Sequence, residues 1–216
     1  MAPTPPSPSR SSWLGRWRRL WAARRDPARI GDASVLQSAL MGVRMSAVAR
    51  ASVDRLLRDR GPAVLRLALD DEALLRLPPG TFGRALVDFC HANAIMRATV
   101  SDEIDDAELA EVSATVRYIV IHDMLHVLLD CDTSIPEELR ITAFILEQRY
   151  FRGGRLWLGV LYLFGPLVRP WLALRTLANI RRGRALARRA PMLLGEPLED
   201  WFAEPVEVVR ARLGIA

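Results

Sequence analysis

The chain has 216 residues and a mass of 24.2 kDa, which suits one domain or one domain with a tail. Half of the residues are apolar and a quarter are charged, so the composition excludes global disorder. The sequence contains no lysine, which excludes chemistry that needs a lysine Schiff base or a phosphate-loop lysine. The two cysteines exclude a disulfide framework and an all-cysteine zinc site, and they favour a reducing compartment.

The charge is distributed unevenly along the chain. Residues 1–25 hold six arginines and residues 148–195 hold ten, and neither stretch contains an acidic residue. The rest of the chain carries 14 arginines against all 25 acidic residues, a net charge of −11. Two cationic stretches on an acidic body indicate a partner that carries phosphates, carboxylates or anionic lipid headgroups.

The first 30 residues are predicted to form a tail, and residues 31–216 a single helical domain. Residues 2–9 are rich in proline and serine and are expected to be disordered. The spacing of the next apolar residues predicts a short amphipathic helix, with Arg16, Arg18 and Arg19 off its apolar stripe of Trp13, Leu14, Trp17, Leu20 and Trp21. This composition is typical of an interfacial membrane anchor, but a solvated tail and a mitochondrial targeting segment also fit it.

The remaining pattern predicts an all-α protein, because no run of alternating β-branched residues is long enough for a sheet. Helical periodicity begins near residue 34 and is interrupted at Gly61-Pro62. A loop over residues 77–83 leads into a helix that begins near Thr81, and residues 107–130 are predicted to form one long helix. Ser134 and Glu137 have the spacing of a capping box, so a further helix is expected to begin there.

Residues 156–168 form an uncharged apolar run that is framed by the arginines of residues 149–189. The run is too short to span a bilayer as a helix, and Gly165-Pro166 is expected to break it. A buried helix is one interpretation, and an apolar wall for a lipid tail or a surface that dips into a membrane is the other. Nucleic acid is not an expected partner, because no nucleic-acid-binding motif accompanies the arginines.

The residues most suited to chemistry are His122, Asp123, His126 and Glu138. Two histidines four positions apart share one helix face at about 6 Å, which is within reach of a single metal ion. A turn near residues 130–134 would let Glu138 on the next helix face His126. This set of imidazoles and carboxylates suits a divalent metal, zinc first, and it leaves room for water or substrate.

Several alternatives accompany the metal-site prediction. A histidine pair at this spacing is also a common surface coincidence. The arrangement fits poorly with a zinc protease, whose second motif position is a glutamate rather than Asp123. Cys131 could be a further ligand, but it is expected to be a buried structural thiol. Cys90-His91 is expected to serve helix packing rather than to form a nucleophile pair.

The motif formed by His122, Asp123, His126 and, after eleven residues, Glu138 resembles that of the fourth coenzyme Q (ubiquinone) biosynthesis protein family. The resemblance extends over about residues 35–215. It includes the loop at residues 77–83, Arg117-Tyr118 and the segment from Leu194 to Ile215. The chain differs from the family's pattern in three places: Ile119-Val120 replace an Arg-Glu pair, Asp130 replaces a glycine, and Glu137 replaces another glycine.

The resemblance implies an all-helical protein that binds a divalent metal, zinc first, through His122, Asp123, His126 and Glu138. It favours an enzyme that removes the carboxylate of a polyprenyl-hydroxybenzoate and places a hydroxyl on the same carbon. A non-catalytic scaffold that binds polyprenyl lipid and organises the other ubiquinone biosynthesis enzymes is the alternative. The implied location is the cytoplasmic face of a bacterial inner membrane, or the matrix side of the mitochondrial inner membrane. Association with an anionic membrane surface is expected, and self-association is left open.

Overall fold

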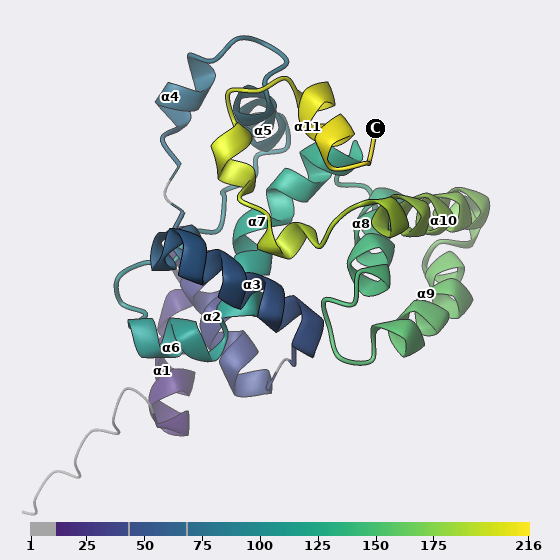
Figure 1. The fold of residues 1–216 in the computed structure, drawn as a ribbon. Coiled ribbons are helices and arrows are strands. Elements are labelled where there is room, and N and C mark those ends of the chain that lie inside the picture. Colours follow the sequence, from purple (N-terminus) through teal and green to yellow (C-terminus); the bar gives the residue numbers. More distant parts are fainter. Residues whose placement is uncertain (1–11, 43, 68) are drawn as a thin grey trace, which may run out of the picture.

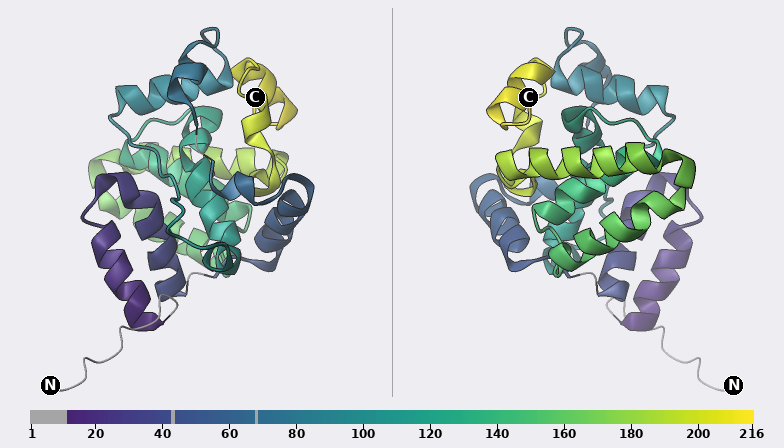
Figure 2. Two further views of the ribbon diagram at one scale, coloured as in Figure 1. Left: turned by 90° about the vertical axis from the view of Figure 1, so that its left-hand side faces the viewer. Right: turned by 90° about the vertical axis from the view of Figure 1, so that its right-hand side faces the viewer.

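The computed structural model describes residues 12–42, 44–67 and 69–216, and these ranges are mainly helical (Figures 1 and 2). The prediction of disorder for residues 2–9 lies outside them. No strand forms in the described ranges, where only two isolated bridges occur, so the all-α prediction is confirmed. The α-helices are α1 (Trp13–Ala23), α2 (Ile30–Met41), α3 (Ala47–Arg60), α4 (Asp71–Leu75), α5 (Phe82–Ala92), α6 (Asp106–Glu111), α7 (Ser113–Leu129), α8 (Ile135–Glu147), α9 (Gly154–Val168), α10 (Ala173–Arg189) and α11 (Val206–Arg212). Short 3-10 helices are η1 (Pro27–Arg29), η2 (Pro62–Leu65), η3 (Pro170–Leu172), η4 (Leu193–Gly195) and η5 (Leu198–Trp201).

Helix α7 lies in the middle of the molecule (Figure 1). It packs against α2, α3, α5 and α11, and its Val116, Ile121 and Leu125 are fully buried. Because α7 is enclosed on several sides, apolar residues occur around most of its circumference rather than on one stripe. This central helix carries both histidines of the sequence motif.

Helices α8, α9 and α10 pack together at one edge of the molecule (Figure 1). They share a small apolar cluster built from Ala143, Leu146, Leu158 and Ile180. The close contact of α10 with α8 depends on Gly183, where a Cβ atom would lie only 2.2 Å from the carbonyl oxygen of Arg140. The second helix of the motif, α8, is therefore held between α10 and the rest of the domain.

Two sequence predictions about these helices are wrong. The stretch expected to be one helix over residues 107–130 is divided at Val112 into α6 and α7. The capping box does not form either, since α8 begins after Ser134 without a side-chain cap hydrogen bond. The reason is that the Glu137 carboxylate pairs with Arg140 and accepts a hydrogen bond from Asn179 on α10 instead of turning back.

The amphipathic helix predicted near the N-terminus forms as α1 and packs against α2. Leu20 is buried against the domain, whereas Trp13 and Trp21 are exposed. Arg16 and Arg19 form ion pairs with Glu111 and Glu108 of α6 (including a 2.7 Å contact from Arg19 to Glu108). Part of the apolar stripe and part of the positive charge are thus used within the domain. The division of the chain at residue 30 stays a prediction.

Helix α9 contains the apolar run and continues through Pro166 to Val168, so the predicted break at Gly165-Pro166 is wrong. Most of its large apolar side chains are exposed, which also contradicts the interpretation as a buried helix. Among the described helices, none alone has the length and hydropathy expected of a membrane span. The pair Gly154–Val168 and Pro170–Arg189 meets both criteria jointly, with a bend of 112° between them.

The turn between α7 and α8 begins at Asp130, which ends α7 in a left-handed conformation with φ 55°. Glycine adopts this conformation without strain, whereas a side chain with a Cβ atom is disfavoured there. The aspartate side chain is exposed and only loosely paired with Arg210, at 3.6 Å. We therefore expect Asp130→Gly to raise the free energy of unfolding by about 0.5–1 kcal/mol. Chemical denaturation followed by circular dichroism checks this, and a loss of stability would contradict it.

Candidate metal centre

The hairpin of α7 and α8 brings His122, His126 and Glu138 together, as the sequence predicts. One ligand atom from each of these residues lies within 4.8 Å of the other two. The Nε2 atom of His126 is 3.3 Å from Oε1 of Glu138. Two ligands of a tetrahedral metal with bonds of about 2.1 Å are roughly 3.4 Å apart, so this pair already has the separation that a zinc ion requires.

Surrounding rings fix the two imidazoles. The His126 side chain is only 2% exposed and stacks on Phe89 of α5, with ring centroids 5.0 Å apart. His122 is partly exposed, and its ring meets the edge of Tyr118 at 5.6 Å and that of His126 at 5.1 Å. One side of the centre is therefore buried and rigid, while His122 and Glu138 lie on the side that solvent or a substrate can reach.

Asp123 lies beside this group rather than within it. Its Oδ1 atom is 3.6 Å from Nδ1 of His122, but no oxygen of Asp123 belongs to the cluster of three converging ligand atoms. The carboxylate adds negative charge next to the two histidines. Its prediction as a fourth ligand stays a prediction.

The electrostatics of the centre favour a cation. Burial by itself would lower the pKa of His126, but hydrogen bonding to Glu138 and the charge of that carboxylate raise it. The same hydrogen bond holds the pKa of Glu138 below its ordinary value. The carboxylates of Glu138 and Asp123 beside the two imidazoles supply negative charge that a divalent metal would neutralise.

The cysteines are placed for packing rather than for chemistry. Cys90 and Cys131 are buried and unpaired, and neither belongs to the cluster of ligand atoms. Burial raises the pKa of Cys90 to about 11 and that of Cys131 to about 12. Both thiols therefore remain protonated near neutral pH, and a protonated thiol is neither a nucleophile nor a metal ligand.

This placement predicts that both thiols react slowly with a thiol reagent such as DTNB while the protein is folded. In denaturant, both should react at the rate of an ordinary cysteine, because burial no longer raises the pKa. Absorbance at the wavelength of the released thiolate gives both rates. Fast stoichiometric labelling of the folded protein would contradict the assignment.

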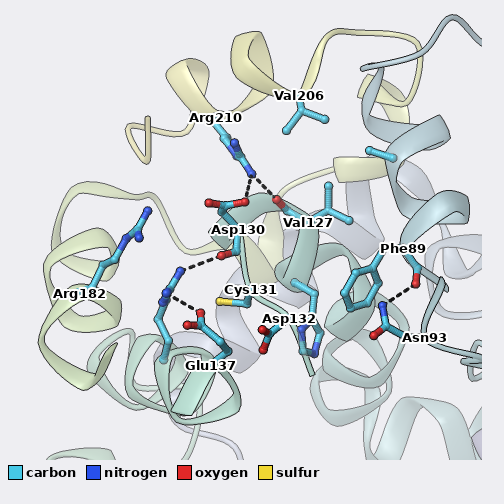
Figure 3. A pocket seen from close by; sticks show the side chains of 13 residues that line it. Phe89, Asn93, Val127, Asp130, Cys131, Asp132, Glu137, Arg182, Val206 and Arg210 are labelled. Atoms are coloured by element: carbon cyan, nitrogen blue, oxygen red, sulfur yellow. Dashed lines mark hydrogen bonds and ion pairs between the residues drawn. The ribbon is translucent and has the colours of Figure 1, made fainter. Parts of the chain in front are cut away.

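A polar cavity of ≈ 610 Å³ adjoins His126 (Figure 3). Figure 3 shows Arg210 reaching from α11 to the Asp130 carboxylate and to the carbonyl oxygen of Val127. Arg140, also in the wall, is occupied by hydrogen bonds to backbone carbonyls and to Asn179. Arg182 is exposed and has no ion-pair partner among the residues that the structure describes, so it is the arginine in this wall that can meet an anionic ligand.

A second cavity, of ≈ 680 Å³, lies between α8 and α9 and is mainly apolar. Phe151 in its wall contacts the ring of Tyr118 at 5.8 Å, and Tyr118 in turn contacts His122. Thr142, also in the wall, lies one helical turn after Glu138 and donates a hydrogen bond to its carbonyl oxygen. The lining consists of Arg44, Thr142, Leu146, Phe151, Arg152, Trp157, Val160 and Leu161.

Sequence reasoning did not identify Tyr118 and Phe89 as parts of the centre. Tyr118 could have been found, because Tyr118, His122 and His126 recur every four residues and so share one helix face. Phe89 comes from a helix more than 30 residues away, and nothing in its local sequence points to His126. The sequence pattern did not distinguish Arg182 from the other arginines of residues 149–189.

Comparison with known proteins decides the family. Residues 22–216 match the family described as "Coenzyme Q (ubiquinone) biosynthesis protein Coq4". This chain belongs to the Coq4 family. The match covers every α-helix except most of α1, and it includes all residues of the candidate centre.

Curated relatives agree with the Coq4 assignment. The chain is 34% identical over 165 residues to "Ubiquinone biosynthesis protein COQ4 homolog, mitochondrial" of Bos taurus, covering 74% of this chain and 60% of that protein. It is 32% identical over 174 residues to the Leishmania infantum protein of the same name, covering 72% and 88% of the two chains. Against the Bos taurus, Rattus norvegicus, Mus musculus and Homo sapiens relatives, the alignment spans 60% of the relative's length.

A solved structure from Nostoc punctiforme PCC 73102 has the same fold. The TM-score is 0.58 at 20% identity, and the alignment covers 97% of this chain and 99% of that one. At this identity, the likeness concerns the fold alone.

The structure explains two of the three differences from the Coq4 pattern. Asp130 occupies a left-handed position that a glycine would fill without strain. Glu137, in place of the other glycine, is buried but paired with Arg140 and Asn179, so its charge is compensated. Nothing in the structure explains the third difference, at Ile119-Val120.

Proposed function

We propose that this Coq4-family chain takes part in coenzyme Q synthesis as a metal-dependent enzyme that acts on a polyprenyl-hydroxybenzoate at a membrane. The convergence of His122, His126 and Glu138 carries the proposal. An apolar cavity supports it, because Phe151 in the cavity wall contacts Tyr118, which in turn contacts His122. The proposed partners are a prenyl lipid and the other enzymes of ubiquinone synthesis. The curated relatives bear names that place them in ubiquinone biosynthesis and in mitochondria, which supports this assignment.

The donor set fits a divalent metal. Two imidazole nitrogens and one carboxylate oxygen within 4.8 Å make three protein ligands, which is the number that leaves a position free for substrate or water in catalytic zinc sites. Zinc is the first metal to test, and iron and manganese also accept such mixed ligands. A bound metal would supply Lewis-acid polarisation of a ring oxygen or activation of an oxygen donor.

The residues around the centre suit a substrate with a long apolar tail and an anionic head. The apolar cavity provides Leu146, Phe151 and Leu161 as walls for isoprene units. The carboxylate of the ring needs a cation, and Arg182 in the polar cavity has no acidic partner among the described residues. Because His126 also lines that cavity, a substrate carboxylate bound by Arg182 would lie on the His126 side of the cluster.

The proposed reaction breaks the bond between the ring carbon and its carboxylate, and carbon dioxide leaves. A hydroxyl oxygen then occupies the same carbon, so the ring loses two electrons to an oxygen-atom donor such as dioxygen acting with a reductant. Exclusion of bulk water by the buried side of the centre, where His126 stacks on Phe89, would limit side reactions of the activated ring.

The test uses metal-loaded protein, dioxygen with a reductant, and a prenylated 4-hydroxybenzoate whose carboxyl carbon is isotopically labelled. We expect release of labelled carbon dioxide with formation of the hydroxylated ring, and loss of both with Glu138→Gln. Glu72→Gln, at an exposed position on α4, is the matched control for loss of one carboxylate and should retain full turnover. No turnover by metal-loaded wild type that still binds the lipid would overturn the enzymatic proposal and favour the non-catalytic scaffold.

A further inference from the structure

The exposed apolar side chains of the described residues are concentrated in one place. Eight of the sixteen large hydrophobic residues that are exposed lie between residues 156 and 174, on α9, η3 and the first turn of α10. The right-hand view of Figure 2 looks onto this edge, and no other element lies in front of α9 and α10. We call these residues the elbow surface: Leu156, Trp157, Leu163, Phe164, Leu167, Val168, Trp171 and Leu174.

We propose that the elbow surface inserts into the headgroup region of an anionic bilayer and holds the protein on the membrane. The spacing of Leu156, Leu163 and Leu167 places them on one side of α9, so the helix can lie flat with that side in the lipid. Trp171 is 77% exposed and Leu174 is 84% exposed, at the corner where the chain turns from α9 into α10. Tryptophan favours the boundary between headgroups and acyl chains.

The charge around the elbow surface selects an anionic partner. Arg155 and Arg169 lie at the two ends of α9, and neither has an ion-pair partner among the described residues. No acidic residue occurs between residues 148 and 195. Phosphate groups of a bilayer would neutralise these arginines at the depth where the tryptophans insert.

The same charge argues against a second copy of this chain as the occupant. A symmetric dimer through the elbow surface would place the arginines of one copy opposite those of the other. The segment offers no acidic side chain to compensate them, and like charges at an interface oppose association. A membrane satisfies both the apolar residues and the arginines.

The apolar cavity opens next to the elbow surface, which suggests a route for a prenyl substrate; this step rests on the proposed function. Trp157 belongs to the elbow surface and also lines the cavity between α8 and α9. Arg152 lies in the same wall. A prenyl chain would thus pass from the bilayer past Trp157 into the cavity without crossing water.

Vesicle binding tests the proposal without substrate or turnover, so its failure is distinct from that of the enzymatic function. We expect the wild type to sediment with vesicles of phosphatidylcholine and phosphatidylglycerol. The double variant Trp171→Glu, Leu174→Glu should bind at least about tenfold more weakly, because two apolar side chains no longer enter the lipid. Arg155→Gln with Arg169→Gln should lose roughly fivefold per arginine on these vesicles and little on pure phosphatidylcholine.

The matched control is Val48→Glu with Val208→Glu, which adds the same charges at exposed apolar positions on α3 and α11. This variant should bind within about twofold of the wild type after allowance for the added charge. Equal binding by the wild type and the elbow variant would overturn the proposal. If the elbow variant still binds vesicles and loses that binding when residues 1–25 are removed, the anchor is α1. If the wild type is a dimer that the elbow substitutions dissociate, the occupant of the elbow surface is a second copy of the chain.

Discussion

Replacing Glu138 by glutamine is expected to weaken divalent metal binding by about 100-fold or more while the protein stays folded. Loss of a neighbour that merely orients a ligand costs roughly 10–100-fold in metal affinity, so loss of a ligand should cost at least as much. Glu138 is the suitable residue for this test because its side chain is 41% exposed and glutamine keeps its size. Titration with zinc or cobalt, followed by calorimetry, gives the affinity.

Two further variants separate the ligands from their neighbour. His122→Ala should match Glu138→Gln, because both residues contribute to the converging cluster. Asp123→Asn should cost less, since Asp123 lies beside His122 and outside the cluster. Circular dichroism should show the same helix content in all three. If Glu138→Gln binds zinc as tightly as the wild type, the assignment of Glu138 as a ligand is wrong.

Replacing Arg117 by methionine is expected to lower the free energy of unfolding by about 3–5 kcal/mol, because the substitution leaves a partly buried acid without its partner. The Arg117 side chain is 0% exposed on α7 and donates to Glu199 and to the carbonyl oxygen of Glu196, both at 2.7 Å. It also donates to the carbonyl oxygen of Val64 in η2. One guanidinium therefore joins η2 and the C-terminal segment to the helix that carries the histidines.

An exposed pair in the same region provides the control. Arg60 on α3 pairs with Asp200, next to Glu199 in the sequence, and their side chains are 47% and 36% exposed. Arg60→Met should cost no more than about 1 kcal/mol, because solvent screens such a pair. Denaturation in urea gives both values under the same conditions. Equal effects of the two substitutions would contradict the assignment of Arg117 as a buried tie.

Much of the candidate centre could be predicted because its geometry is local. His122 and His126 share a helix face by their spacing alone, and the interval from His126 to Glu138 contains a turn and little else. Two adjacent helices joined by a short turn pack side by side, so Glu138 returns to the level of His126. The contacts of Phe89 and Arg182 were not predictable in this way, because helices distant in the sequence bring them to the site.

The errors have similar causes. Glu137 has the right spacing for a capping box. Its carboxylate instead pairs with the buried Arg140 of α8 and accepts a hydrogen bond from Asn179 of α10. The apolar run of α9 has the composition of a buried helix, but its large side chains are mostly exposed. Composition alone does not show whether another part of the chain covers a helix. Gly165-Pro166 was expected to break the apolar run, yet α9 continues through Pro166 and ends two residues later, at Val168.

The central claim is that His122, His126 and Glu138 hold one divalent metal ion between α7 and α8. Anomalous diffraction from crystals grown with zinc, recorded above and below the zinc absorption edge, tests this claim directly. We expect one strong anomalous peak within bonding distance of both imidazoles and the Glu138 carboxylate. A zinc-bound crystal whose anomalous peaks all lie elsewhere, with these three side chains uncoordinated, would contradict it.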